Sequence, residues 1–219
     1  MSYAWLKILF FLLIVKPVIL IVIGLNVRRR KNLPSHGPAI IVANHNSHLD
    51  ALALLSLFPL ALIPRVRPVA AADYFLSNRW LAWFSSHLIG IIPLSRKPSS
   101  GLRDPFKAAC QALLAGDILV VFPEGSRGQP EQMAQLKKGI AHLSARNPSV
   151  PVIPVFVHGL GKTLPKGEGL LVPFICDVYV GEAMKHAEDK GVFMRQMKQR
   201  FDDLSEEFDR DSGKQIAPR

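Results

Sequence analysis

The chain begins with a long apolar stretch, and shorter apolar runs alternate with amphipathic segments after it. Residues 5–27, WLKILFFLLIVKPVILIVIGLNV, are hydrophobic almost throughout. At about 1.5 Å per residue, a helix of this length crosses the hydrocarbon core of a bilayer. Lys7 can snorkel from one end, but Lys16 and Pro17 interrupt the middle, where a lysine is costly in lipid and a proline kinks a helix. The pattern therefore predicts a membrane-embedded helix or a helical hairpin in one leaflet.

Beyond residue 37, apolar runs rich in Val and Ile alternate with segments of helical spacing. The runs predict strands at 39–43, 68–72, 90–94, 118–122, 152–157 and 175–180. The spacing predicts helices at 49–57, 78–87, 102–114 and 131–146. Such alternation indicates an α/β fold with a mostly parallel or mixed sheet flanked by helices.

The last part of the chain has the clearest helical period. Five large apolar residues recur at helical spacing with charges between them: Phe193, Met197, Phe201, Leu204 and Phe208. We expect this stripe to pack on the core, rather than to lie on a membrane surface. The expected organisation is a membrane anchor with a basic flank at 1–31, one domain at 32–212 and a flexible tail at 213–219.

Composition and charge narrow the class of protein. Hydrophobic residues make up 49% of the chain, which excludes a disordered protein, and two cysteines do not build a disulfide framework. The net charge is +10, and the whole excess lies in residues 1–107, the more apolar half. No nucleic-acid-binding motif accompanies it, so we expect no nucleic-acid partner. A basic and apolar half indicates an anionic membrane surface as partner.

The position of the basic cluster bears on orientation. Arg28–Lys31 follow the apolar run, whereas the charged region of a signal peptide precedes it. By the positive-inside tendency this end of the run is cytoplasmic and faces lipid headgroups. The predicted location is the cytoplasmic face of the inner membrane of a bacterium.

Polar clusters directly follow three of the predicted strands. They are Asn44–Asp50, Ser95–Lys97 and Pro123–Arg127. Active sites of open α/β sheets gather at the carboxyl edge of the strands. If these strands are parallel, the three clusters share one edge.

His45 and Asp50 are candidates for a base and the acid that orients it. Five residues on one helix would place them about 140° apart, so they meet only if His45 lies in a loop and Asp50 in the first helical turn. Asp50 would then hold one imidazole nitrogen and leave the other to accept a proton from a substrate hydroxyl. A structural capping pair and a metal site using His45, His48 and Asp50 are the alternatives.

The other two clusters are suited to an anion. Arg96 and Lys97 supply positive charge on one side. Gly125 and Arg127 supply backbone N–H groups and a guanidinium on the other. Glu124 can accept a hydrogen bond from a polyol or hold an arginine, and Lys137, ten residues beyond Arg127, can reach the same pocket.

These clusters resemble the ordered sequence blocks of the glycerolipid acyltransferases. NHNSHLD at 44–50 matches their Asn-His-x-x-x-x-Asp signature, and FPEGSR at 122–127 matches their Phe-Pro-Glu-Gly-Thr-Arg block, with Ser126 at the threonine. GIIPLSR at 90–96 resembles the second block and VPVIPV at 150–155 the fourth. Lys137 begins a lysine-glycine segment similar to the one that often follows the third block. Leu136 stands where many relatives have phenylalanine.

The resemblance implies a glycerol-3-phosphate acyltransferase-like fold and an O-acyltransferase activity. His45, oriented by Asp50, would deprotonate a lysolipid hydroxyl, which attacks an acyl thioester with no acyl-enzyme and no metal. Five residues would hold the acceptor's glycerol phosphate: Arg96, Glu124, Gly125, Ser126 and Arg127. Asn44 and Lys137 are further candidates for contacts with substrate or donor.

The same resemblance indicates the substrates, and two other functions are weighed against it. It implies 1-acylglycerol-3-phosphate as acceptor, with another lysophospholipid or a lyso-aminolipid as the alternative. No bound cofactor is expected, and acyl-CoA or acyl-acyl-carrier protein would be the co-substrate, so the carrier protein is a candidate partner. A metal-dependent hydrolase and a non-catalytic lipid-binding protein are more remote alternatives.

Overall fold

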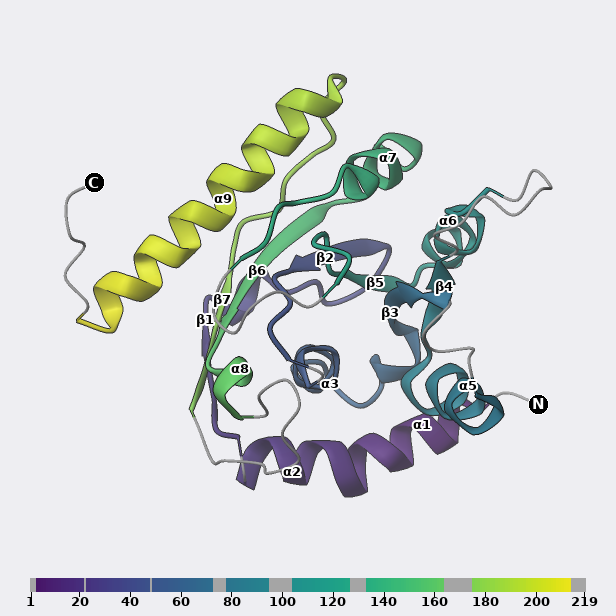
Figure 1. Ribbon diagram of the computed structural model, residues 1–219. Helices are drawn as coiled ribbons and strands as arrows, with labels where there is room; N and C mark the ends of the chain where they lie inside the picture. The colour runs from purple at the N-terminus through teal and green to yellow at the C-terminus, as the bar shows by residue number, and fades with distance from the viewer. Residues whose placement is uncertain are drawn as a thin grey trace.

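The computed structural model describes residues 3–21, 23–47, 49–72, 78–94, 104–126, 133–163 and 175–213. Within these residues a seven-stranded sheet has the order β1-β7-β6-β2-β5-β3-β4 (Figure 1). The strands are β1 Leu25–Arg28, β2 Ala39–Ala43, β3 Val66–Ala71, β4 Ile92–Leu94, β5 Ile118–Val121, β6 Val152–His158 and β7 Cys176–Val180. Only β6 and β7 pair antiparallel. The predicted α/β fold with a mostly parallel, mixed sheet is confirmed.

The central strands are apolar along their whole length because helices cover both faces of the sheet. Alternate residues of β2 point to opposite faces, so Ile41 enters one hydrophobic core while Ile40 and Val42 enter the other. α3 (Asp50–Ser56) and the N-terminal helix pack on the first core. α6 (Lys107–Leu114), α7 (Gly139–Arg146) and α9 (Lys190–Asp211) pack on the second.

The shorter elements lie between these layers and at their ends. They are α5 Arg79–Phe84, α8 Leu160–Thr163, a π-helical turn at Ser85–Ile89 and 3₁₀ turns at Arg30–Asn32 and Ile63–Arg65. The C-terminal stripe behaves as expected: Asp189 caps α9 by accepting a hydrogen bond from the N–H of Val192, and all five large apolar residues are buried in the second core. Residues 214–219 of the predicted tail lie outside the described residues.

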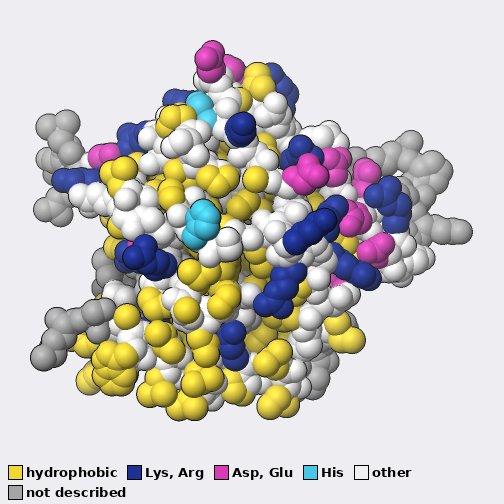
Figure 2. Space-filling view, turned by 180° about the vertical axis from the view of Figure 1, so that it is seen from behind, with side chains coloured by type: hydrophobic (Ala, Val, Ile, Leu, Met, Phe, Trp, Pro, Cys, Tyr) yellow, Lys and Arg dark blue, Asp and Glu magenta, His cyan; other side chains and the backbone are white. Residues whose placement is uncertain are grey.

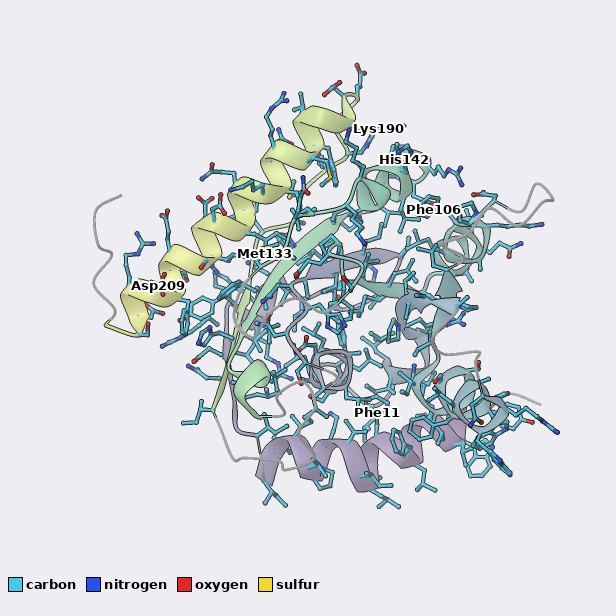
Figure 3. The ribbon with its side chains drawn as sticks, in the orientation of Figure 1. Phe11, Phe106, Met133, His142, Lys190 and Asp209 are labelled. Atoms are coloured by element: carbon cyan, nitrogen blue, oxygen red, sulfur yellow. The ribbon has the colours of Figure 1, made fainter. Side chains whose placement is uncertain are left out.

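The apolar N-terminal segment is one helix that lies along the domain. α1 (Ala4–Phe10), a π-helical turn (Phe11–Val15) and α2 (Lys16–Ile21) follow one another without a break, below α3 in Figure 1. Phe11 points from this helix into the first core and is fully buried (Figure 3). The segment is long and apolar enough to cross a membrane, by length and composition alone. Of the two predicted forms, a helix and a helical hairpin, the structure shows the helix, which continues past Lys16 and Pro17.

Both lysines of this helix face the protein. The Lys7 amine donates to the Val66 carbonyl at 2.7 Å, and the Lys16 amine donates to the Phe58 carbonyl at 3.1 Å. The snorkelling expected of Lys7 is therefore wrong, since its side chain is 3% exposed. Turning both amines inward leaves the outer face of the helix apolar.

The end of the predicted anchor belongs to the sheet. Residues 25–28 form β1, an edge strand parallel to β7, where the sequence predicted a continuation of the apolar segment. The following arginines bind the domain: Arg28 and Arg29 pair with Asp211 and Glu207 of α9, and Arg30 donates to the Leu57 carbonyl. These contacts tie the basic run to the domain, where the sequence predicted contacts with headgroups.

Other differences from the predicted elements are at their boundaries. The helix expected at 131–146 begins only at Gly139, because residues 134 and 137 donate their N–H groups to the turn after β5. The helix expected at 78–87 ends as α5 at Phe84 and continues as the π-helical turn. Tertiary contacts thus override the helical pattern before Gly139, whereas the helix predicted at 78–87 is present and extends to Ile89.

Candidate active site

The polar cluster after β2 and the one after β5 meet at one edge of the sheet. β2 pairs parallel with β5 and with β6, so the carboxyl ends of these three strands point the same way. β4 also runs parallel to its neighbour β3. The parallel strand directions on which the shared edge was inferred from the sequence are therefore confirmed.

His45 and Asp50 meet across the turn between β2 and α3. His45 lies in the loop and Asp50 is the first residue of α3, as the spacing required. The Nδ1 atom of His45 is 2.8 Å from Oδ2 of Asp50. Because a carboxylate only accepts, Nδ1 carries the proton and Nε2 presents its lone pair. The His45 side chain is 20% exposed, so this lone pair can reach a substrate.

Asp50 is completely buried, and its hydrogen bonds hold the loop around His45. Oδ2 also accepts the N–H groups of Asn46 at 2.6 Å and Ser47 at 2.8 Å. Burial raises the pKa of the Asp50 carboxyl, while the hydrogen bonds from His45, Ser47 and Asn46 act in the opposite direction. These donors belong to the loop before α3, so Asp50 orients the His45 imidazole and does not cap the first turn of the helix. The role of His45 as a base stays a prediction.

Two further contacts fix the position of the imidazole. Its ring stacks on Phe122, the residue after β5, with centroids 4.2 Å apart. Asn44 and Asn46, on either side of His45, both donate to the Val157 carbonyl, at 2.8 and 3.0 Å. Asn44 also accepts the Val157 N–H at 2.8 Å, so both ends of its buried amide bridge β2 to β6. A substrate contact by Asn44 stays a prediction.

Glu124 holds the backbone of the site together. Its Oε1 accepts the N–H of His45 at 2.7 Å, and its Oε2 accepts the N–H of Ala134 at 2.8 Å. The residue is 2% exposed. Burial raises the pKa of Glu124, and the two backbone hydrogen bonds oppose this shift. The structure thus gives Glu124 a positioning role, while the predicted contact with substrate stays a prediction.

Gly125, Ser126 and Lys137 lie beside this carboxylate. Gly125 has φ +70° and its N–H closes a turn to the Phe122 carbonyl at 3.1 Å, so this N–H is already used within the protein. A Cβ on Gly125 would lie 2.9 Å from the Lys137 amine, which places Lys137 directly against the turn. Ser126 is exposed next to them. The structure therefore brings together His45, Asp50 and these neighbours.

The remaining predicted anion ligands lie outside the described residues. They are Arg96, Lys97 and Arg127, and His48 is also outside. Among the residues that are described, no three His, Cys, Asp or Glu side chains form a group that could hold a metal ion.

Sequence reasoning missed Phe122, Asn46 and Val157 as parts of the site. One signal was available: Asn44 and Asn46 are two residues apart, so in an extended chain they point to the same side and His45 to the other. The stacking of Phe122 and the contact with β6 depend on strand order, which the sequence did not provide.

The chain belongs to the acyltransferase family, whose model matches residues 24–158. That segment contains the strands and loops that build the site around His45. The chain is 32% identical over 149 residues to the chloroplastic 1-acyl-sn-glycerol-3-phosphate acyltransferase of Arabidopsis thaliana, a match covering 67% of this chain and 40% of that protein.

Two bacterial proteins are also similar to this chain. The 1-acyl-sn-glycerol-3-phosphate acyltransferase of Pseudomonas aeruginosa is 29% identical over 75% of this chain and 60% of its own length. The crystal structure of a 1-acyl-sn-glycerophosphate acyltransferase from Thermotoga maritima matches with a TM-score of 0.70 and 20% identity, over 93% of this chain and 79% of that one. The chain spans about two fifths to three fifths of these curated relatives.

Proposed function

We propose that this protein transfers a fatty acyl group from a thioester donor to the hydroxyl of 1-acylglycerol-3-phosphate, forming phosphatidic acid. The observation that carries the proposal is the His45–Asp50 pair, with its donor-acceptor distance of 2.8 Å at the edge of the sheet. The family match and the printed activities of the relatives support the reaction and the acceptor.

The reaction follows from the orientation of the imidazole. Nε2 of His45 takes the proton of the acceptor hydroxyl, and the oxygen attacks the thioester carbonyl carbon. The tetrahedral intermediate collapses as the C–S bond breaks, and the thiolate takes the proton back from His45. Asp50 stabilises the imidazolium formed between these steps, so no acyl-enzyme is needed.

The acceptor's phosphate needs cationic partners near His45. Lys137 lies against the turn at Gly125 and is the described residue best placed for this role. We propose Arg96 and Arg127 as further ligands of this phosphate, together with Gly125 and Ser126. We propose acyl-CoA or acyl-acyl-carrier protein as the donor, since each carries its acyl group as a thioester.

The outer face of the N-terminal helix is proposed to rest in the membrane that holds the acceptor. Large apolar side chains are exposed there: Trp5, Leu9, Leu12, Leu13, Ile14, Val18, Leu20 and Ile21. Figure 2 shows hydrophobic side chains gathered over the lower part of the molecule, while charged ones lie mostly above. A helix with its lysines turned into the domain can lie in the interface of an anionic membrane without burying charge in lipid. The cytoplasmic face of a bacterial inner membrane is the proposed location.

Purified protein assayed with a panel of lysolipids and both donor types tests the function. We expect 1-acylglycerol-3-phosphate to give the highest kcat/KM and the product to be phosphatidic acid. Preference for another lysophospholipid or a lyso-aminolipid would overturn the acceptor assignment. Failure to acylate every lysolipid would overturn the activity.

A further inference from the structure

A polar cavity lies at the opposite edge of the sheet from His45. It has a volume of about 270 Å³, and Lys7 of α1, Arg67 of β3, His87 and Asp117 line it. Arg67 is the second residue of β3, and Asp117 immediately precedes β5. Since these parallel strands begin where β2 also begins, the cavity and the His45 site lie at opposite ends of the strands.

The cavity concentrates positive charge. The buried Lys7 amine has the Val66 carbonyl as its hydrogen-bond acceptor, and Arg67 donates to the Gly90 carbonyl at 3.1 Å and to Asp117 at 3.4 Å. Asp117 is the one acidic side chain among the described residues that line the cavity. The cavity therefore holds two basic side chains and one carboxylate, which pairs with Arg67.

The surroundings of Lys7 disfavour the charged form of its amine. Burial, and secondly the charge of Arg67, lower the pKa of the Lys7 amine to about 7, with Asp117 opposing them. An anion that binds next to a lysine with such a lowered pKa stabilises the charged form of its amine. Gly90 leaves room for the amine, since a Cβ there would lie 2.8 Å from Nζ.

Aromatic rings surround the cavity near the N-terminal end of the apolar helix. The His87 ring stacks on Trp83 at 5.3 Å between centroids and meets the edge of Tyr3 at 4.4 Å. Nδ1 of His87 donates to the Trp83 carbonyl at 2.8 Å, so Nε2 can donate a hydrogen bond to an anion only in the protonated ring. Trp83 and Tyr3 are both exposed, and Trp and Tyr favour the headgroup level of membranes.

We propose that this cavity binds a phosphate-bearing anion between Lys7, Arg67 and His87, as a site separate from the catalytic edge. Its volume is near the lower end of small-molecule sites, roughly 300–1,000 Å³, and suits a headgroup-sized ligand. The guanidinium supplies a fork of donors and Lys7 a point charge, the combination that recognises phosphate. The phosphate comes from an acidic phospholipid headgroup or from free phosphate ions. The proposal does not depend on the acyltransferase activity.

Glycine amide signals in an NMR titration separate this cavity from the active site. Full-length protein labelled with ¹⁵N-glycine in a non-ionic detergent and phosphate-free buffer is titrated with inorganic phosphate. Gly90 reports on the cavity, and Gly125 reports on the catalytic edge. We expect a saturable chemical-shift change of the Gly90 amide. The Kd for phosphate obtained from it should be at least tenfold higher in Arg67→Gln, since a hydrogen bond to a charged group contributes about 1.5–3 kcal/mol. Arg65→Gln is the matched control, because Arg65 carries the same charge and does not line the cavity.

Bicelles then identify the source of the phosphate. A Gly90 shift with phosphatidylglycerol bicelles, and none with phosphatidylcholine alone, assigns the site to a lipid headgroup; a shift only with inorganic phosphate assigns it to a soluble ion. His87→Ala, which keeps the Arg67–Asp117 pair, is the second variant and is also expected to weaken binding. No response of Gly90 to any ligand, or an equal response in Arg67→Gln and wild type, overturns the proposal.

Discussion

At the scale of single residues, the proposed chemistry depends on one buried carboxylate. Asp50 receives three donors on a single oxygen, from the imidazole and from two loop N–H groups. It therefore sets both the tautomer of His45 and the shape of the loop that carries it.

Asp50→Asn tests the orientation of the base. The amide has nearly the same size but cannot stabilise an imidazolium, so we expect kcat to fall by about 10²–10⁴-fold with little change in KM for the acceptor. Steady-state kinetics of the purified variant measures both. His36→Ala, at an exposed histidine, is the control and should keep its activity. An Asp50→Asn enzyme with wild-type kcat would contradict the assignment.

Glu124→Gln separates positioning from substrate binding. One of the two N–H donors, His45 or Ala134, would then face an amide NH₂, which costs about 1–3 kcal/mol. We expect a lower free energy of unfolding and a lower kcat, with KM nearly unchanged. A higher KM at unchanged stability would instead indicate direct contact with the acceptor. Denaturant unfolding and kinetics on the same preparation distinguish the two.

Lys7 predicts a pH dependence of stability. The pKa of the Lys7 amine falls from 10.5 in the unfolded chain to about 7 in the folded protein. At a pH between these two pKa values, the unfolded chain therefore binds more protons than the folded protein. The free energy of unfolding should therefore rise with pH across this window, by an amount on the order of a few kcal/mol. Lys7→Met should flatten the rise when unfolding is measured from pH 6.5 to 9.5 in phosphate-free buffer. An equal slope in both proteins would show that Lys7 does not carry it.

At the scale of elements, the apolar helix is an interface with two different sides. One side buries Phe11, Val15 and Ile19 in the first core, and the other exposes the residues that we propose contact lipid. Lys7 and Lys16 lie on the side that faces the domain, because both amines donate to backbone carbonyls there.

Leu13→Glu tests the outer side of the helix. Leu13 is 62% exposed, and moving a leucine into an apolar phase contributes about 1.5–3 kcal/mol. We expect binding to vesicles that contain phosphatidylglycerol to weaken at least tenfold in a flotation assay. Leu114→Glu, at a residue 85% exposed on α6, is the matched control and should float like wild type. If the two variants float alike, the helix is not the docking face.

The sequence predicted elements well where periodicity and burial agree. β2 spans the predicted residues 39–43, and α9 buries the five residues of the predicted stripe. It missed β1, because Leu25–Arg28 continues an apolar run and pairs with β7, about 150 residues away in the chain. It also overextended the helix before Gly139, where contacts with Glu124 and Pro123 take the backbone N–H groups.

At the scale of the whole molecule, the sheet separates two polar edges. His45 lies at the carboxyl ends of the strands, and the cavity lined by Lys7, Arg67, His87 and Asp117 lies at their amino ends. The sequence predicted the first edge because its clusters follow strands. It did not predict the second, because Lys7, Arg67 and Asp117 come together only through strand order and helix packing.

The excess of positive charge also divides at this scale. Arg28 and Arg29 bind acidic residues of α9, and Lys7 and Lys16 bind backbone carbonyls of the domain. Three residues of the predicted basic flank thus make contacts with the domain while remaining exposed on its surface. We therefore expect affinity for an anionic membrane to depend mainly on the apolar face of the N-terminal helix.

Acyl transfer by wild-type and His45→Ala proteins tests whether His45 is the base of the reaction. Purified proteins are incubated with 1-acylglycerol-3-phosphate and an acyl thioester, and phosphatidic acid is measured as it forms. We expect turnover by the wild-type protein and a kcat at least about 10²-fold lower in His45→Ala. The thermal unfolding midpoints of the two proteins should agree within a few degrees. Near-normal turnover by a folded His45→Ala protein would contradict this role of His45.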